Sequence, residues 1–237
     1  MKISDFYLRN KRLLYFILFM LFSAGNAYYG CLVFVREPSL FSDPIFFTLR
    51  ITWLLFYEIL CLVLLAFVLL DRGESLLNFG LSFKVKDFLH SLTLSFGSLI
   101  GIAFCATIQY LFGHFVFKNP NPNIDMHLLK AFNNSLGILP FYLIIPFIFL
   151  NPVFEELIMR SFFMTELNFF IRKGFLVVLL SALIQAGYHL YQGWDIFPMH
   201  FIHFFVYSVY YQKTKRITPV VLSHFYFDAY GILRTVF

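Results

Sequence analysis

The sequence predicts an all-α protein, a bundle of helices that crosses a membrane about seven times with its N-terminus in the cytoplasm. Of the 237 residues, 60% are hydrophobic and only 13% are charged, whereas ordinary globular chains carry about 25% charged residues. The mean hydropathy of +0.77 is correspondingly high. Together these values exclude an ordinary soluble domain.

Apolar runs of about 20 residues, the length that spans a bilayer as a helix, recur along the chain. The expected spans are residues 13–35, 45–70, 90–117, 136–154, 175–193, 196–212 and 217–235. The first is too long for a signal-peptide core and is expected to be retained. The last three are short or polar, as helices that line an internal site should be. We therefore expect two parts, three N-terminal spans in 1–135 and a transmembrane core in 136–237.

The distribution of basic residues predicts the orientation. The segments expected inside hold Lys2, Arg9, Lys11, Arg12, Arg72, Lys84, Lys86, Arg160, Arg172, Lys173, Lys213, Lys215 and Arg216. The segments expected outside hold Arg36, Lys118, Lys130 and Arg234, and Arg50 lies within a span. Thirteen against four follows the positive-inside rule. The net charge of +5 thus indicates membrane topology and contact with anionic lipid, and nucleic acid is not an expected partner.

Two connections and the cysteines complete the outline. Residues 76–89 mix apolar, glycine and basic residues and are expected to lie along the inner membrane surface. The outer segment 118–127 is rich in Pro and Asn and should be irregular. The three cysteines occupy three different apolar runs without a CxxC pair, so neither a disulfide framework nor a thiolate metal site is expected.

Six ionisable side chains stand inside or beside the C-terminal apolar runs, where a charge costs about 3 kcal/mol and usually has a function. They are Glu155, Glu156, Arg160, His189, His224 and Asp228. Carboxylates and imidazoles of this kind are the groups that activate water in hydrolases. The set is therefore the candidate site.

Helical spacing assigns partners within this set. Glu156 and Arg160 are i,i+4 neighbours in the favourable order, so we expect them to pair. Glu155 is rotated by about 100° from Glu156 and is left free to act as a base. His224 and Asp228 are also i,i+4 neighbours, which suits a carboxylate that orients an imidazole.

Other histidines and the neighbours of His189 are less specific. His189 has polar company in Gln185, Tyr188 and Gln192. His200 and His203 lie one turn apart and could face the interior, but no catalytic role is assigned to either.

In chain order these motifs resemble the CAAX-protease and bacteriocin-processing (Abi) family of intramembrane proteases. Its pattern is EExxxR, then FxxxH, then HxxxN or HxxxD, matched here by Glu155-Glu156-xxx-Arg160, by His189 and by His224-xxx-Asp228. The resemblance covers about residues 136–230. One departure is Gln185, which stands where the family has an aromatic residue, and this puts the fit of the substrate in question more than catalysis.

The resemblance implies that Glu155, assisted by His189 and His224, activates water for attack on a peptide carbonyl. Asp228 would orient His224 or help to stabilise the oxyanion, and Glu156 with Arg160 would shape the site. Two alternatives stay open for the activation itself. Glu155, His189 and His224 would match the ligands of a catalytic Zn²⁺ with an open water position, or a Glu–His pair would act without metal.

A span that ends at residue 154 creates a difficulty of depth. It places Glu155 at the cytoplasmic boundary, while His189 lies about 24 Å along the next helix. Kinks or breaks at Pro146 and Pro152 would hold the EELIMR segment deeper in the membrane and resolve the conflict. With that segment at the surface, the catalytic interpretation fails.

The leading hypothesis is an endopeptidase of a bacterial plasma membrane that cleaves a small peptide or the end of a membrane-associated protein. Bacteriocin self-immunity or peptide processing is the expected setting. The rivals are a non-catalytic immunity or scaffold protein that keeps the fold, and a proton-coupled transporter. The sequence does not indicate the oligomeric state.

Overall fold

The computed structural model describes residues 3–115, 134 and 139–236, and within these ranges the chain is helical without a β-strand. The long helices are α1 (Ile3–Arg36), α2 (Pro44–Asp71), α3 (Val85–Phe115), α5 (Phe141–Glu156), α6 (Phe163–Ile171), α7 (Gly174–Tyr188), α8 (Phe197–Thr214) and α9 (Thr218–Val236). Short helical turns are η1 (Pro38–Ser42), η2 (Leu76–Phe79), η3 (Leu157–Phe162) and η4 (Leu190–Gln192). The predicted all-α fold is confirmed. The expectation of an irregular segment at 118–127 lies outside the described residues.

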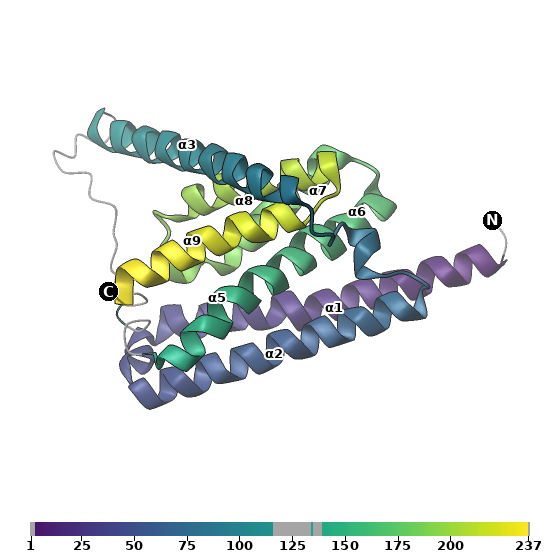
Figure 1. Ribbon diagram of the computed structural model, residues 1–237, viewed down its shortest axis with the longest axis horizontal. Coiled ribbons are helices and arrows are strands. Elements are labelled where there is room, and N and C mark those ends of the chain that lie inside the picture. The colour runs from purple at the N-terminus through teal and green to yellow at the C-terminus, as the bar shows by residue number, and fades with distance from the viewer. Residues whose placement is uncertain (1–2, 116–133, 135–138, 237) are drawn as a thin grey trace.

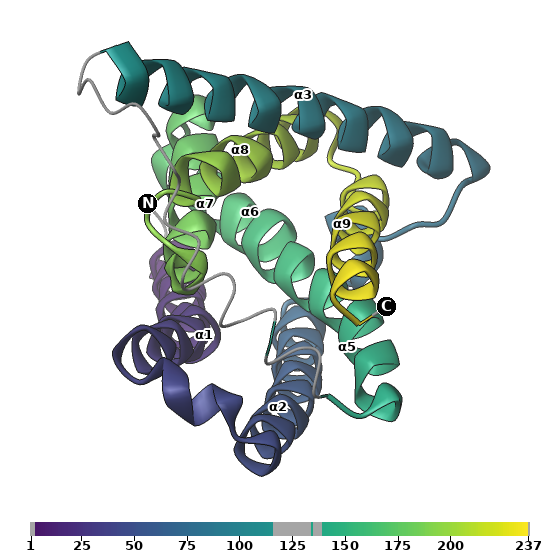
Figure 2. The same cartoon turned by 90° about the vertical axis from the view of Figure 1, so that its left-hand side faces the viewer.

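The helix formed by α5, η3 and α6 runs through the middle of the bundle. Figure 2, which looks along the helices, shows it surrounded by α1, α2, α9, α8 and α7, while α3 lies across the outside against α8 and α9. Figure 1 shows α1 and α2 side by side along one flank. A segment of the C-terminal core is thus enclosed by its own later helices and by the two N-terminal ones.

Four helical stretches in the described ranges are long and apolar enough to cross a membrane: Arg9–Arg36, Pro44–Asp71, Val85–Phe112 and Phe141–Ile171. A shorter apolar helix follows at Gly174–Tyr188. The remaining helices, α8 and α9, are less apolar and line the interior. This agrees with a multi-pass bundle whose last three helices were expected to be short or polar.

The largest error in the expected boundaries is at the end of the fourth span. This span does not end at residue 154 but continues without interruption through η3 to Ile171. Pro146 and Pro152 lie inside α5 without ending it, although each lacks the N–H that the helix would use. Arg160, counted above as an inside residue, is wholly buried in this helix. Without it, the segments expected inside hold twelve basic residues and those expected outside hold four.

This extension resolves the difficulty of depth. Glu155 lies 16 residues before Ile171, or about 24 Å along the helix. His189 lies 15 residues after Gly174, about 22 Å along the returning helix. Both distances start from the same turn at residues 172–173. The glutamate and the histidine therefore reach the same depth, near the middle of the bundle.

The connection between α2 and α3 is docked on the end of the bundle. Phe79 is buried, and its carbonyl accepts hydrogen bonds from Ser161 and Tyr211. Gly80 has a φ of +82°, and its carbonyl accepts from the backbone N–H of Ile217 at 3.2 Å. Contact of residues 76–89 with the membrane surface stays a prediction.

The same end of the bundle is tied by a buried ion cluster. Glu166 of α6 is fully buried and meets Arg12 of α1 at 2.7 Å and Arg72 at 2.8 Å. Three elements that are distant in sequence are thereby joined on the side that carries the basic connections.

Candidate active site

The buried pair of Glu156 and Arg160 is the structural centre of the candidate site. Both side chains are fully buried, with Arg160 Nε 3.1 Å from Glu156 Oε2 and Nη1 3.2 Å from Oε1. The i,i+4 pairing expected from the sequence is confirmed. His224 Nδ1 lies 2.7 Å from Glu156 Oε1. Because a carboxylate only accepts, Nδ1 carries the proton and donates it.

The turn that carries this pair is a π-helix, η3, and such turns often occur at functional sites. Its wider turn opens backbone carbonyls that an α-helix would satisfy. Neighbouring helices compensate, because Ser181 Oγ of α7 donates to the carbonyl of Met159 at 2.9 Å. Arg160 Nη2 also donates to the carbonyl of Phe204 on α8 at 3.4 Å. The surrounding helices therefore hold EELIMR inside the bundle.

Glu155, rotated away from Glu156, faces the end of α7. Its Oε2 accepts hydrogen bonds from Gln185 Nε2 at 2.7 Å and from the hydroxyl of Tyr188 at 3.1 Å. The side chain is buried but meets no arginine or lysine in the described part of the chain. Neutral hydrogen-bond donors thus position the Glu155 carboxylate, and its remaining lone pairs can accept a proton from a water molecule.

His189 stands at the C-terminal cap of α7, opposite Glu155. Its Nδ1 lies 2.9 Å from the carbonyl of Gln185, which fixes the proton on Nδ1. Its Nε2 lies 4.0 Å from Glu155 Oε2. For a water oxygen about 2.8 Å from both atoms, the angle between the two hydrogen bonds would be about 90°, close to the H–O–H angle of water. The separation therefore suits one shared water.

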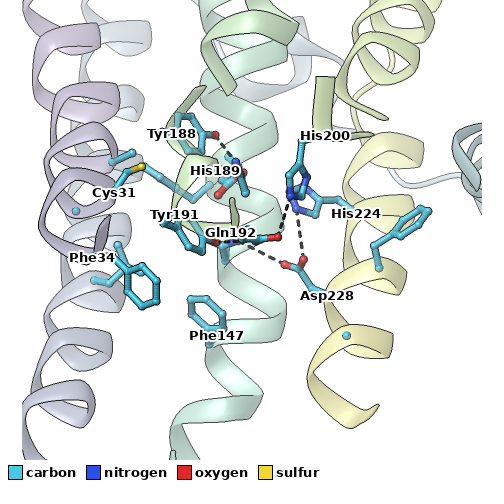
Figure 3. A pocket seen from close by; sticks show the side chains of 18 of the residues that line it. Cys31, Phe34, Phe147, Tyr188, His189, Tyr191, Gln192, His200, His224 and Asp228 are labelled. Atoms are coloured by element: carbon cyan, nitrogen blue, oxygen red, sulfur yellow. Dashed lines mark hydrogen bonds and ion pairs between the residues drawn. The ribbon is translucent and has the colours of Figure 1, made fainter. Parts of the chain in front are cut away.

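These groups line a cavity of about 790 Å³. Its walls come from the second half of α1, the first half of α2, the second half of α5 with the start of η3, the η4 turn, the first half of α8 and the C-terminal part of α9. The lining residues lie in the half of the bundle away from the basic connections. Figure 3 shows His224 and Asp228 on α9 across the cavity from Cys31 and Phe34 of α1.

His224 and Asp228 form the opposite wall. His224 Nε2 lies 3.5 Å from Asp228 Oδ1, as their spacing on the helix predicts, and Asn151 Nδ2 approaches Asp228 Oδ2 at 3.4 Å. His224 is thereby held at both nitrogens, by Glu156 on one side and Asp228 on the other. It is fixed in orientation with its Nε2 side toward the cavity.

The two additional histidines of α8 also lie in the cavity wall. His200 Nε2 is 2.8 Å from Gln192 Oε1, and its ring lies 5.0 Å from that of His189. The ring of His203 packs against Tyr207 and Phe227. His200 therefore contacts the His189 side of the site, whereas His203 lies on the His224 side.

The residues proposed for a zinc site do not fit one as they stand. Within the described residues, no three His, Cys, Asp or Glu side chains form a group that would hold a metal ion. Both ring nitrogens of His224 face carboxylates, an arrangement that holds them as N–H donors, so neither offers a lone pair to a metal ion. The chemistry below is therefore derived from the protein's own side chains.

Comparison with protein families finds a match to the model described as "Type II CAAX prenyl endopeptidase Rce1-like", over residues 137–230. Over these residues the chain is similar to the CAAX endopeptidase family. The match contains all six predicted site residues and leaves the first three helices outside. No curated protein and no solved structure matches the chain. This similarity agrees with helices buried in a membrane and supports a peptidase in general terms.

The structure brings together five of the six predicted residues around the cavity or directly behind it, and Arg160 joins them through Glu156. Sequence reasoning treated Gln185 as a lost aromatic, yet it donates to Glu155. Its position four residues before His189 was the available signal. The sequence analysis also did not single out Glu58, the acid within the second apolar run, although Glu58 lines the same cavity.

Proposed function

We propose that this protein is an intramembrane endopeptidase that hydrolyses a peptide bond of a small peptide or of the end of a membrane-associated protein. The observation that carries the proposal is the 4.0 Å separation of Glu155 Oε2 and His189 Nε2 at the wall of a large cavity. Two basic atoms that share one water, deep inside a membrane protein, provide a nucleophile where bulk water is scarce.

In the proposed reaction the shared water attacks the peptide carbonyl as Glu155 takes its proton. Nδ1–H of His189 stays on the Gln185 carbonyl, so Nε2 accepts the second hydrogen bond of the water and orients it. The tetrahedral intermediate then collapses, the C–N bond breaks, and Glu155 returns the proton to the leaving amine. One water is consumed, and a carboxyl and an amine are formed.

His224 is the candidate donor to the oxyanion that forms during attack. Glu156 holds its Nδ1 and Asp228 approaches its Nε2, an arrangement that favours a charged imidazolium with an N–H on the cavity side. Fixed donors of this kind contribute through preorganisation. Arg160 would act indirectly by neutralising Glu156.

A bacterial plasma membrane, and processing of a bacteriocin-like or signalling peptide, remain the proposed setting. The position of the cavity supports a substrate that enters from the half of the bundle that carries η1, between α1 and α2. With the N-terminus in the cytoplasm, that half faces the outside.

The test is hydrolysis by the full chain reconstituted in lipid vesicles. A pool of peptides, including ones that end in a CAAX sequence, is incubated with protein-containing and empty vesicles, and products are identified by mass spectrometry. We expect cleavage at a defined bond only with the protein. Intact peptides throughout would refute the peptidase, and substrate-dependent proton flux in the same vesicles would then favour a transporter. The absence of both activities would leave the non-catalytic partner.

A further inference from the structure

Glu58 is the buried acid that the proposed mechanism does not use. It lies on α2, outside the region matched by the family model. Its side chain is fully buried, it lines the cavity, and neither carboxylate oxygen has a hydrogen-bond partner in the described part of the molecule. Since an unpaired buried carboxylate is costly, such a group calls for a partner that arrives from elsewhere.

The other fully buried acids of the described residues show what Glu58 lacks. Glu156 meets Arg160, Glu166 meets Arg12 and Arg72, and Asp87 meets Arg216. Each is neutralised by an arginine of the chain itself. Glu58 has no such partner and faces the cavity, so its counter-charge is expected from a ligand in that space.

Glu58 stands at the depth of the reacting bond. It follows Pro44, the first residue of α2, by 14 residues, and Glu155 follows Phe141, the first residue of α5, by the same number. The two helices start at the same end of the bundle and pack together (Figure 1). Both carboxylates therefore lie about 21 Å from that end. A group that meets Glu58 would lie beside the carbonyl attacked at Glu155.

The charges that line the cavity favour a cation as that group. Three carboxylates face it, those of Glu58, Glu155 and Asp228. The cations of the lining are Arg50 and the His224 imidazolium proposed above, which pairs with Asp228. Arg50 precedes Glu58 by eight residues, about 12 Å along α2, and does not form an ion pair with it. An excess of acid at the inner part of the cavity attracts a positively charged side chain.

We infer that Glu58 binds the ammonium or guanidinium group of a Lys or Arg side chain next to the cleaved bond, and so selects the substrate. The inference rests on the proposed function, because it names a residue of the peptide that Glu155 would cleave. A charge-assisted hydrogen bond in this dry position should favour a cationic substrate by about 10- to 100-fold.

The first arm of the test compares matched peptides that differ at one position beside the cleaved bond. That position holds Lys, norleucine, which keeps the chain without the charge, or Glu. We expect the wild-type kcat/KM for Lys to exceed that for norleucine by about 10- to 100-fold. Glu58→Gln should bring the ratio to about one, and Glu58→Lys should shift the preference to the Glu peptide.

Glu37→Gln is the matched control, because this substitution makes the same change of charge. Glu37 is exposed at the end of α1, beside the same half of the bundle. It should leave the Lys-to-norleucine ratio as in the wild type. Either of two results would overturn the inference while the peptidase stands. One is a wild-type Lys-to-norleucine ratio near one, whichever side of the cleaved bond carries the varied residue. The other is a ratio that Glu58→Gln leaves intact.

A second arm does not depend on hydrolysis. Binding of the Lys and norleucine peptides is measured by thermal shift on Glu155→Gln protein with and without Glu58→Gln. Stronger binding of the Lys peptide that vanishes with Glu58→Gln supports the inference even where no peptide is cleaved, in which case only the proposed function fails. Equal binding of both peptides would refute it. The melting curves without peptide also report whether each variant is folded.

Discussion

Removal of the Arg160 guanidinium tests the buried network behind the site most severely. Arg160 is fully buried, meets Glu156 through two nitrogens, and lies 5.0 Å from the ring of Phe204 and 5.7 Å from that of Tyr207. Arg160→Met keeps apolar volume but leaves Glu156 without its principal counter-charge. Breaking a buried pair in this way costs about 3–5 kcal/mol, so we expect a loss of that size in the free energy of unfolding.

The double variant Glu156→Gln with Arg160→Met separates the loss of charge pairing from the loss of packing. The amide oxygen that replaces the Glu156 carboxylate would still accept the hydrogen bond from His224 Nδ1. We therefore expect most of the stability to return. Unfolding in mixed micelles with increasing dodecyl sulfate, followed by circular dichroism, gives the free energies. Lys11→Met, which removes an exposed pair with Asp71, is the control and should leave the unfolding midpoint unchanged.

Two results would refute this reasoning. One is an Arg160→Met protein within about 1 kcal/mol of the wild type, the size of an exposed pair. The other is a double variant no more stable than Arg160→Met alone, which would mean that packing around Phe204, and not the uncompensated glutamate, sets the cost.

Three further outcomes follow from the geometry. Gln185→Leu removes the 2.7 Å hydrogen bond to Glu155 and should lower kcat about tenfold with little change in KM; an unchanged kcat would contradict a positioning role. Chelators should leave hydrolysis intact, because both nitrogens of His224 face carboxylates; stoichiometric zinc by mass spectrometry, with activity lost on its removal and restored on its return, would contradict this. Gly80→Ala should cost about 2 kcal/mol or more, because φ is +82° and the new Cβ would meet the carbonyl of Lys215; a wild-type unfolding free energy would exclude the close approach.

Much of the fold follows from hydropathy, because apolar runs of membrane length admit little besides helices. The expected limits of α2, 45–70, differ from the observed Pro44–Asp71 by one residue at each end. The error at residue 154 has a physical cause. An average of hydropathy cannot distinguish a charged residue at a membrane boundary from one that is paired inside the bundle. It counts Glu156 and Arg160 as two charges, although they form a buried ion pair.

The site shows the same division between local and tertiary information. The pairings within one helix, Glu156 with Arg160 and His224 with Asp228, follow from i,i+4 spacing. The pairing of His224 with Glu156 joins residues 68 positions apart, and no periodicity indicates it. Glu58 could have been singled out as an acid in an apolar span, but its place beside the cavity depends on how α2 packs on α5.

The most direct test of the account is the single-turnover hydrolysis rate of Glu155→Gln protein in vesicles, measured with the peptide that the wild type cleaves. The substitution keeps the shape of the side chain and removes its capacity to take a proton from the shared water. The account predicts a fall of about 10³-fold, with peptide binding retained. A rate within a few-fold of the wild type would show that Glu155 is not the base and would contradict the mechanism.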